Sequence, residues 1–355
     1  MSLSVDYTRS SDLAVFASVL GCDASEVPLS VTVIVPTHNE VAHIGAVLDS
    51  MPAYVDRVIV VDDASSDGTA ALVEKRGEAR VSLIRHETNR GVGAAMRTGY
   101  QAAIEAGSDL VVKMDGDGQM RPEELRRLLG ALVIGLADYA KGNRFYLRDA
   151  SADMPRQRSF GNSVFSFLTK IASGYWHVFD SQCGFTAVRG SYLKLIDLSL
   201  LPDDYFFENA MLIQLNAVNA RVVDVPTSTI YGQEVSGIDV RRVLLTFPPR
   251  LLSAGLGRFW RKQLVTDFGA IGGLTIVGLL LCGFGVVFGV YHWWLSTVSQ
   301  HFASTGTVML AVLPFIVGVQ LIVQAYVLSV QASPGAQETA DYARMLIAEG
   351  EFERP

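Results

Sequence analysis

The sequence is poor in cysteine and in charged residues, and each shortage excludes a class of protein. Its three cysteines, Cys22, Cys183 and Cys282, are spread over 355 residues, which excludes a disulfide-stabilised secreted module and a cysteine-based zinc site. Charged residues make up only 18% of the chain, and 29 basic against 36 acidic side chains give a net charge of −7. A polycation that binds nucleic acid is therefore excluded.

The shortage of charge is concentrated near the C-terminus, where residues 268–337 contain no Asp, Glu, Lys or Arg. Residues 268–294 and 308–330 form two apolar runs, and each is long enough to cross a bilayer as a helix, for which roughly 20 residues suffice. The linker between them, residues 295–307, is polar. We therefore predict two transmembrane helices over residues 268–332. Two buried core helices are the alternative.

Basic residues on the flanks predict the orientation of this hairpin. Those that precede the first run are Arg241, Arg242, Arg250, Arg258, Arg261 and Lys262. The linker has none, so we expect the N-terminal part and the tail, residues 333–355, to be cytosolic. Alternation of apolar and basic side chains over residues 244–267 indicates an amphipathic interfacial helix, with a helix packed entirely on the preceding domain as the alternative. Residues 1–28 are a polar extension without the pattern of a signal peptide.

Short apolar, β-branched runs alternate with helical patterns over residues 29–243. The strand-like runs are residues 30–35, 57–61, 81–85, 110–114 and 138–141, and the helical patterns are residues 42–51, 68–76, 93–106 and 122–136. This alternation predicts an α/β domain with a mostly parallel sheet covered by helices on both faces. Ligands of such sheets bind beyond the carboxyl ends of the strands.

Polar segments follow four of the predicted strands. They are Pro-Thr-His-Asn-Glu at residues 36–40, Asp-Asp-Ala-Ser-Ser-Asp-Gly-Thr at 62–69, Asn-Arg-Gly-Val-Gly-Ala-Ala at 89–95 and Asp-Gly-Asp-Gly-Gln at 115–119. Each alone is typical of a turn or a helix cap. Together, in this order, they predict one ligand site at the edge of the sheet.

With these segments in this order, the sequence resembles the family 2 glycosyltransferases. The similarity is to the branch that includes dolichyl-phosphate mannose synthase and bacterial polyprenyl-phosphate glucosyltransferases. The resemblance covers residues 29–237. Three features narrow the match to this branch of the family: Gln119 after the second Asp, Gly-Asn-Arg at residues 142–144 and Gly-Phe at residues 184–185. It implies a cytosolic GT-A domain, Rossmann-like with a mixed, mostly parallel sheet, followed by the transmembrane hairpin, in a bacterial inner membrane.

The resemblance implies transfer of a hexose from a UDP- or GDP-linked donor to the phosphate of a polyprenyl phosphate of the undecaprenyl or dolichyl type. The departing nucleotide diphosphate gathers negative charge, which a divalent cation neutralises. Hard oxygen ligands suit Mg²⁺ or Mn²⁺. By resemblance, Asp117 and Gln119 are metal ligands, and Asp115 contacts ribose, sugar or the metal shell. Gly116 lets the backbone approach the nucleotide. A solvated turn before Pro122 is the alternative.

The same resemblance assigns the other site residues. Pro36, His38, Glu40, Val61 and Asp63 should line the nucleotide pocket, where the carboxylates accept hydrogen bonds from ribose or base. His38 stands where related sequences often have Tyr, which leaves the choice of base open.

The guanidinium group of an arginine can bind a phosphate with two hydrogen bonds. By resemblance, Arg144 and Arg158 match family positions that contact phosphate or sugar. Asp180 is expected near the acceptor phosphate or in ordering its loop, and Glu208 near the sugar. The loop at residues 231–237 lacks the Lys of related sequences.

The expected mechanism is a single inverting displacement that needs no strong base, because a phosphate monoester is already an anion. A processive polysaccharide synthase is one alternative, but the Gln-x-x-Arg-Trp motif usual before its spans is missing. A non-catalytic sugar-nucleotide-binding scaffold is the other, and it would not need Asp115, Asp117 and Gln119. The glycine-rich first apolar run is compatible with a homo-oligomer.

Overall fold

The structure is a computed structural model that describes residues 29–146, 156–227, 240–266 and 269–348. It divides into two units. The first holds the described residues up to Ala254 together with those from Pro334 onward, and the second comprises Gly255–Ser333. The chain therefore leaves the first unit, forms the second and returns to the first. The expected extension, residues 1–28, lies outside the described residues.

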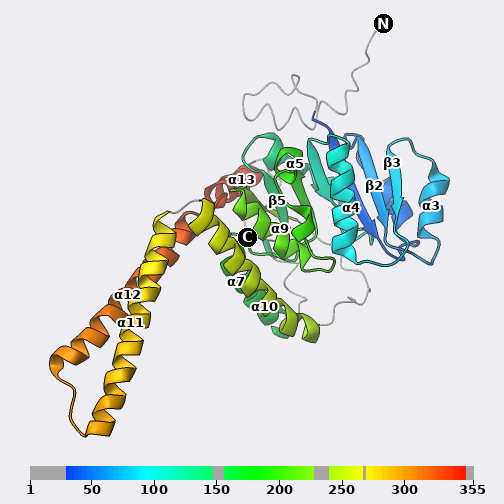
Figure 1. The fold of residues 1–355 in the computed structure, drawn as a ribbon. Coiled ribbons are helices and arrows are strands. Elements are labelled where there is room, and N and C mark those ends of the chain that lie inside the picture. The colour runs from blue at the N-terminus through cyan, green and yellow to red at the C-terminus, as the bar shows by residue number, and fades with distance from the viewer. Residues whose placement is uncertain (1–28, 147–155, 228–239, 267–268, 349–355) are drawn as a thin grey trace. The chain divides into compact units, whose positions relative to one another are not determined.

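A seven-stranded mixed sheet forms the centre of the first unit (Figure 1). Its strands are β1 (Val31–Thr37), β2 (Arg57–Asp62), β3 (Val81–Arg85), β4 (Leu110–Lys113), β5 (Tyr139–Asn143), β6 (Thr186–Arg189) and β7 (Val222–Pro226). They are ordered β3-β2-β1-β4-β6-β5-β7, and only β6 runs antiparallel to its neighbours. The five predicted strands are confirmed, whereas β6 and β7 were not predicted.

Helices cover both faces of this sheet. Their bounds are α2 (Ile44–Asp49), α3 (Thr69–Arg76), α4 (Val92–Glu105), α5 (Leu125–Val133), α7 (Arg156–Ser173), α8 (Gly190–Leu193), α9 (Phe207–Ala217), α10 (Val240–Phe259) and α13 (Ala336–Ala348), with 3₁₀ turns η1 (Pro122–Glu124), η2 (Arg144–Tyr146) and η3 (Leu198–Leu200). Side chains alternate along a strand, so Val33 enters one core with α2 and α5 while Ile34 enters the other with α4 and α9. The predicted α/β sandwich is confirmed.

The C-terminal helix α13 is part of the first unit. Tyr342 and Leu346 are fully buried in the core shared with α5, and the Tyr342 hydroxyl donates to the Arg127 carbonyl at 2.6 Å. Gly335, with φ +89°, lies so close to β7 that a Cβ atom there would be 2.2 Å from the Val222 carbonyl oxygen. The described residues of the tail expected at residues 333–355 thus pack on β7, the edge strand of the sheet, from Pro334 onward.

The second unit contains α11 (Ala270–Ser299) and α12 (Thr305–Gln331), two helices long and apolar enough to cross a membrane. Only 17% and 6% of the residues in their most apolar windows are buried, which disfavours two core helices. The loop between them is shorter than the predicted linker, because α11 continues to Ser299 and the Ser304 hydroxyl caps α12 by accepting from Thr307 N at 3.2 Å.

Small residues let α11 and α12 approach closely. A Cβ atom at Gly278 would lie 2.9 Å from the Gly318 carbonyl oxygen, and one at Gly318 would lie 2.6 Å from that of Gly278. These glycines therefore serve packing inside the hairpin.

The predicted amphipathic segment, residues 244–267, begins four residues earlier, as α10, and continues as a π-helical segment, η4 (Trp260–Thr266). Phe247 and Leu251 are buried in the core of the first unit, whereas Leu252 is 65% exposed. In the part of this segment that belongs to the second unit, Leu256 and Trp260 are 61% and 63% exposed. Apolar side chains of this segment are therefore buried in the first unit, and others are exposed in each unit.

We expect Tyr342→Ala to lower the free energy of unfolding of the first unit by about 3 kcal/mol, since it leaves a cavity behind α5. Tyr342→Phe keeps the ring and should cost about 1 kcal/mol for the lost hydrogen bond to the Arg127 carbonyl. Denaturant unfolding of the detergent-solubilised chain measures both. Arg344→Ala is the control on the same helix, because its side chain is 77% exposed, and it should change stability by less than about 0.5 kcal/mol. A Tyr342→Ala protein as stable as this control would contradict the packing of α13.

Candidate active site

Parallel pairing brings the ends of three strands to one edge of the sheet. Pro36 of β1 pairs with Val61 of β2, and on the other side of β1 the Met114 N–H after β4 donates to the Ile34 carbonyl at 3.0 Å. The acidic segment then crosses the end of β1, since a Cβ atom at Gly116 would lie 2.6 Å from Thr37 Cγ2. The structure thus places segments 36–40, 61–63 and 115–119 together, as the sequence predicts.

His38 is held by hydrogen bonds on both ring nitrogens. Its Nε2 lies 3.1 Å from the side-chain amide nitrogens of Asn39 and Asn89. The amide oxygens of these two residues accept from Ser66 N and Gly91 N, so their nitrogens face His38 as donors. Nε2 is therefore the acceptor, and Nδ1 carries the proton and donates to the Asp63 carbonyl at 2.8 Å.

The Asp63 side chain is 5% exposed, and its carboxylate organises the loop after β3. It accepts from His86 Nδ1 at 2.7 Å, from Arg90 N at 3.0 Å and from Gly91 N at 2.6 Å. Gly91 has φ +93°, which favours glycine. Protein donors therefore occupy both oxygens of Asp63, and its expected contact with ribose or base stays a prediction.

Glu40 lies between β1 and α2. Its N–H donates to Thr69 Oγ1 at 2.9 Å, and its carbonyl accepts from Ile44 N, at the first residue of α2, at 2.9 Å. The turn thereby places Glu40 beside the segment that follows β2.

The acidic segment after β4 has an ordered backbone. Asp117 Oδ1 accepts from Gln119 N at 3.0 Å, and Gly118 between them has φ +74°. Asp115 Oδ1 lies 2.7 Å from Lys113 Nζ, and its side chain is 31% exposed. One carboxylate is thus oriented by the backbone and the other by an ammonium group.

Arg144 and Asp180, both predicted site residues, form a bidentate ion pair. Arg144 Nε and Nη2 donate to the two oxygens of Asp180 at 2.7 and 3.0 Å, and Arg144 N donates at 3.2 Å. The Asp180 side chain is 2% exposed, against 26% for Arg144. Asp180 therefore fixes the orientation of the Arg144 guanidinium group through two parallel hydrogen bonds.

Glu208, in the first turn of α9, lies between two buried lysines that sequence reasoning missed. Its carboxylate oxygens are 3.3 Å from Lys113 Nζ and 3.9 Å from Lys141 Nζ. Burial alone would lower the pKa of Lys113, but the carboxylates of Asp115 and Glu208 outweigh it and raise that pKa. The available signal was a lysine within each of two apolar strands.

Three carboxylates of the site act on one further side chain, Tyr205, which is 50% exposed. Burial raises the pKa of its phenol, and the Asp115 carboxylate raises it further. Glu208 and Asp117 act in the same direction. The ammonium group of Lys113 acts in the opposite direction.

Arg158 lies in α7, but its side chain is outside the described residues, as is the loop at residues 231–237. The structure consequently leaves the predicted role of Arg158 a prediction.

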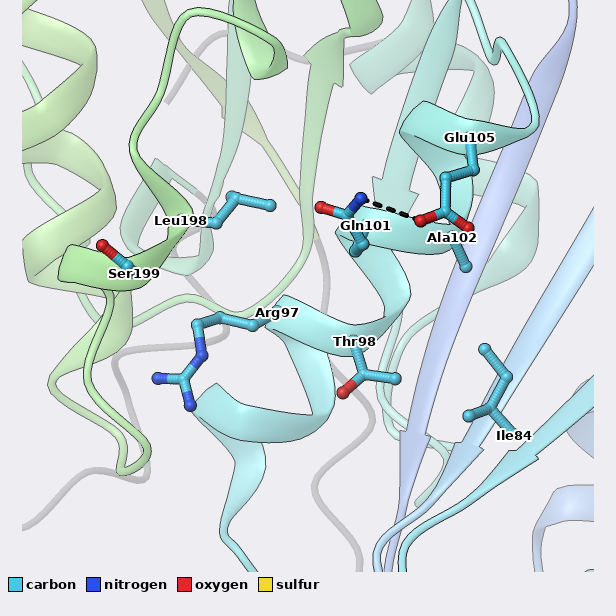
Figure 2. Close-up of a pocket in the computed structure, with 8 residues that line it drawn as sticks. All are labelled: Ile84, Arg97, Thr98, Gln101, Ala102, Glu105, Leu198 and Ser199. Atoms are coloured by element: carbon cyan, nitrogen blue, oxygen red, sulfur yellow. Dashed lines mark hydrogen bonds between the residues drawn. The ribbon is translucent and has the colours of Figure 1, made fainter.

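A surface hollow of about 460 Å³ lies elsewhere, beside α4 (Figure 2). It is lined by Ile84, Arg97, Thr98, Gln101, Ala102, Glu105, Leu198 and Ser199. None of the predicted site residues lines it, and two of its polar groups are paired with each other, since Gln101 Nε2 donates to Glu105 at 2.9 Å. The strand-end site is therefore the better candidate for chemistry.

Comparison with known proteins identifies the family. The model of the glycosyl transferase family 2 matches residues 32–196. Over 215 residues the chain is 31% identical to the UDP-N-acetylglucosamine–dolichyl-phosphate N-acetylglucosaminyltransferase of Methanococcus voltae, covering 56% of this chain and 85% of that protein. Over 209 residues it is 31% identical to the undecaprenyl-phosphate mannosyltransferase of Micrococcus luteus, covering 57% and 84%. The chain is a family 2 glycosyltransferase.

Solved structures show the same fold. Glucosyl-3-phosphoglycerate synthase from Mycobacterium tuberculosis, in complex with Mn²⁺, UDP and glucosyl-3-phosphoglycerate, matches with a TM-score of 0.50 at 18% identity, over 73% of this chain and 86% of that one. Mannosyl-3-phosphoglycerate synthase from Rubrobacter xylanophilus matches with a TM-score of 0.50 at 20% identity, over 71% and 78%. The predicted GT-A fold of the glycosyltransferase is confirmed.

The acidic segment of the glycosyltransferase fits a divalent cation that binds together with a diphosphate. Among the described residues, no three His, Cys, Asp or Glu side chains gather closely enough to hold a metal ion alone. Mg²⁺ and Mn²⁺ are commonly held by one or two carboxylates plus substrate phosphates and water. The hard oxygen donors of Asp115, Asp117 and Gln119, on a backbone ordered at Gly118, match that requirement.

Behind the Arg144–Asp180 pair lies Asp224 of β7, a carboxyl group that is 1% exposed. Its Oδ2 accepts from Asn143 Nδ2 at 2.7 Å and from Phe179 N at 2.9 Å, so it joins the two loops that carry the ion pair. Its Oδ1 has no hydrogen-bond partner among the described residues. Burial raises the pKa of Asp224 from 3.8 to about 7.

This shift predicts the sign of a pH dependence. Between about pH 4 and pH 7 the folded protein keeps a proton on Asp224 that the unfolded chain has lost, so its contribution to stability falls as pH rises through that window. Asp224→Asn has no proton to lose and should show a smaller fall, measured as the midpoint of thermal unfolding at about pH 5 and about pH 7.5. Asp341→Asn, an exposed carboxylate paired with Arg344, should keep the wild-type dependence. If Asp224→Asn shows the same fall in thermal midpoint between these two pH values as the wild type, the raised pKa of Asp224 is contradicted.

Proposed function

We propose that the glycosyltransferase moves a hexose from a UDP- or GDP-linked donor to the phosphate of a membrane-borne polyprenyl phosphate. The observation that carries the proposal is the union, in one chain, of the strand-end site with two helices long and apolar enough to span a bilayer. A lipid-linked acceptor is the substrate that requires both. The names of the relatives in Methanococcus voltae and Micrococcus luteus, which specify dolichyl phosphate and undecaprenyl phosphate, support this acceptor class.

The donor's nucleotide would lie against the ends of β1 and β2, over Pro36, His38, Glu40, Val61 and Asp63. Asp117 and Gln119, with Asp115 beside them, would hold Mg²⁺ or Mn²⁺, whose charge would neutralise the diphosphate as it leaves. The ordered backbone of residues 117–119 holds these donors in place before the substrate arrives, which is how positioning lowers a barrier.

Arg144, which Asp180 holds in place, would bind the acceptor phosphate together with Arg158. One phosphate oxygen attacks the anomeric carbon while the bond from that carbon to the diphosphate breaks, and the nucleotide diphosphate leaves with the electron pair. The configuration at the anomeric carbon inverts. Since the phosphate monoester is already anionic, no group of the protein needs to remove a proton, and electrostatic positioning supplies the catalysis.

The orientation we propose places the catalytic unit in the cytosol and the loop of residues 300–304 outside, in a bacterial inner membrane. Basic residues before α11 support it, while the loop has none. One of them has a structural role, because Arg250 pairs with Asp204 at 2.6 Å. The exposed Leu252, Leu256 and Trp260 support an interfacial position for this segment.

We expect Asp117→Asn to lower transfer by about 100-fold or more, since it removes a charged ligand at the leaving diphosphate. Membranes that carry the protein are incubated with labelled UDP- and GDP-hexoses and Mg²⁺ or Mn²⁺, and label is counted after organic extraction. Glu123→Gln, an exposed carboxylate on η1, is the matched control and should transfer as the wild type does.

Two results would refute the proposal. Wild-type activity in Asp117→Asn would refute the assignment of Asp117 as a metal ligand. Label that enters the organic phase with none of the hexose donors would refute the lipid acceptor. Folding of the variant is checked by its thermal unfolding, so that loss of activity reports chemistry.

A further inference from the structure

Four charged side chains, from β4, the segment after it, β5 and α9, form an ion-pair network at the active site. Lys113 ends β4, Asp115 follows it, Lys141 lies in β5 and Glu208 begins α9. Lys113 is 2% exposed and Lys141 is fully buried. The two ammonium and two carboxylate groups balance in charge, which buried ions require.

Lys113 is the centre of this network. Its Nζ lies 2.7 Å from Asp115 Oδ1 and 3.3 Å from Glu208 Oε1, so one ammonium group joins carboxylates that are 93 residues apart in sequence. Lys141 acts on Glu208 from the other side, at 3.9 Å, and its Nζ donates to the Cys183 carbonyl at 2.6 Å. Each carboxylate is thereby held by a buried cation.

Gly184 closes the network from above. A Cβ atom there would lie 2.2 Å from Lys113 Nζ, 2.8 Å from Asp115 Oδ2 and 3.2 Å from Glu208 Oε1. A side chain at residue 184 would therefore displace the charged groups of this network from their present positions.

The carboxylates remain accessible although the lysines are not. The Asp115 side chain is 31% exposed and that of Glu208 is 11% exposed, against 3% and 0% for Lys113 and Lys141. An ionised carboxylate has about four acceptor positions, so contact with an ammonium leaves both residues with positions that a hydroxyl group can reach.

We propose that Lys113 is a positioning residue that holds Asp115 and Glu208 as one pair of acceptors for the hydroxyl groups of the donor's sugar. The substrate class follows from the acceptor atoms: a hexose whose free hydroxyl groups can donate to these carboxylates is bound. This inference rests on the proposed glycosyl transfer.

Deoxy donors test it, because a purely structural lysine would affect all donors equally. Initial rates of the full-length enzyme in membranes are measured with the hexose nucleotide that it uses and with its 2-, 3-, 4- and 6-deoxy analogues. The wild type should discriminate against at least one analogue by about 10-fold or more, since a carboxylate of the pair then lacks its hydroxyl donor. We define the deoxy ratio as the rate with the normal donor divided by the rate with that analogue. In Lys113→Met the deoxy ratio should approach one, while the KM for the normal donor rises. Lys194 is exposed, so Lys194→Met should keep the wild-type deoxy ratio.

The outcomes separate the two proposals. A wild type that transfers no hexose to lipid refutes the proposed function, whereas normal transfer with an unchanged deoxy ratio in Lys113→Met refutes only the role of Lys113. A wild-type enzyme that discriminates against no deoxy analogue also refutes the role of Lys113. If Lys113→Met does not fold, Glu208→Gln keeps the shape of the side chain and removes one acceptor charge. It should also reduce the ratio, and an unchanged ratio there counts against the pair.

Discussion

Because β1 pairs in parallel with β2 on one side and β4 on the other, three chain segments end at the same edge of the sheet. All else at the site depends on this register. It sets Pro36 beside Val61 and carries the acidic segment across the end of β1, where only glycine fits at residue 116. A shift by one residue would turn every side chain of a strand to the opposite face and separate these groups.

The groups gathered at that edge are held by buried charge. Lys113 and Lys141 hold Glu208, Asp180 holds Arg144, and Asp224 joins the loops that carry this pair. Buried ion pairs contribute little net stability, because desolvation offsets most of their attraction. Their benefit is geometric, since the proposed transfer without a general base relies on groups that are already in position.

The hairpin of α11 and α12 is inserted into the catalytic unit rather than appended to it. The chain leaves that unit after Ala254 and returns at Pro334, and α13 then packs on β7 through Thr339 and on α5 through Tyr342. Both ends of the hairpin are thus joined to segments that belong to one folded domain. Composition revealed the hairpin, but the return of the chain depends on packing across the sheet.

Patterns that are local in the sequence predicted much of this protein: five of the seven strands, the helices between them, the two apolar spans and the segments that carry the site. These features follow from periodicity, run length and chain order, which a sequence displays directly. β6 and β7 were missed because their burial depends on partners distant in the chain, β5 and α13. Lys113, Lys141 and Asp224 escaped notice for the same reason: a charged residue in a strand acquires its role only from partners distant in the chain, and only tertiary structure brings those partners within a few ångströms.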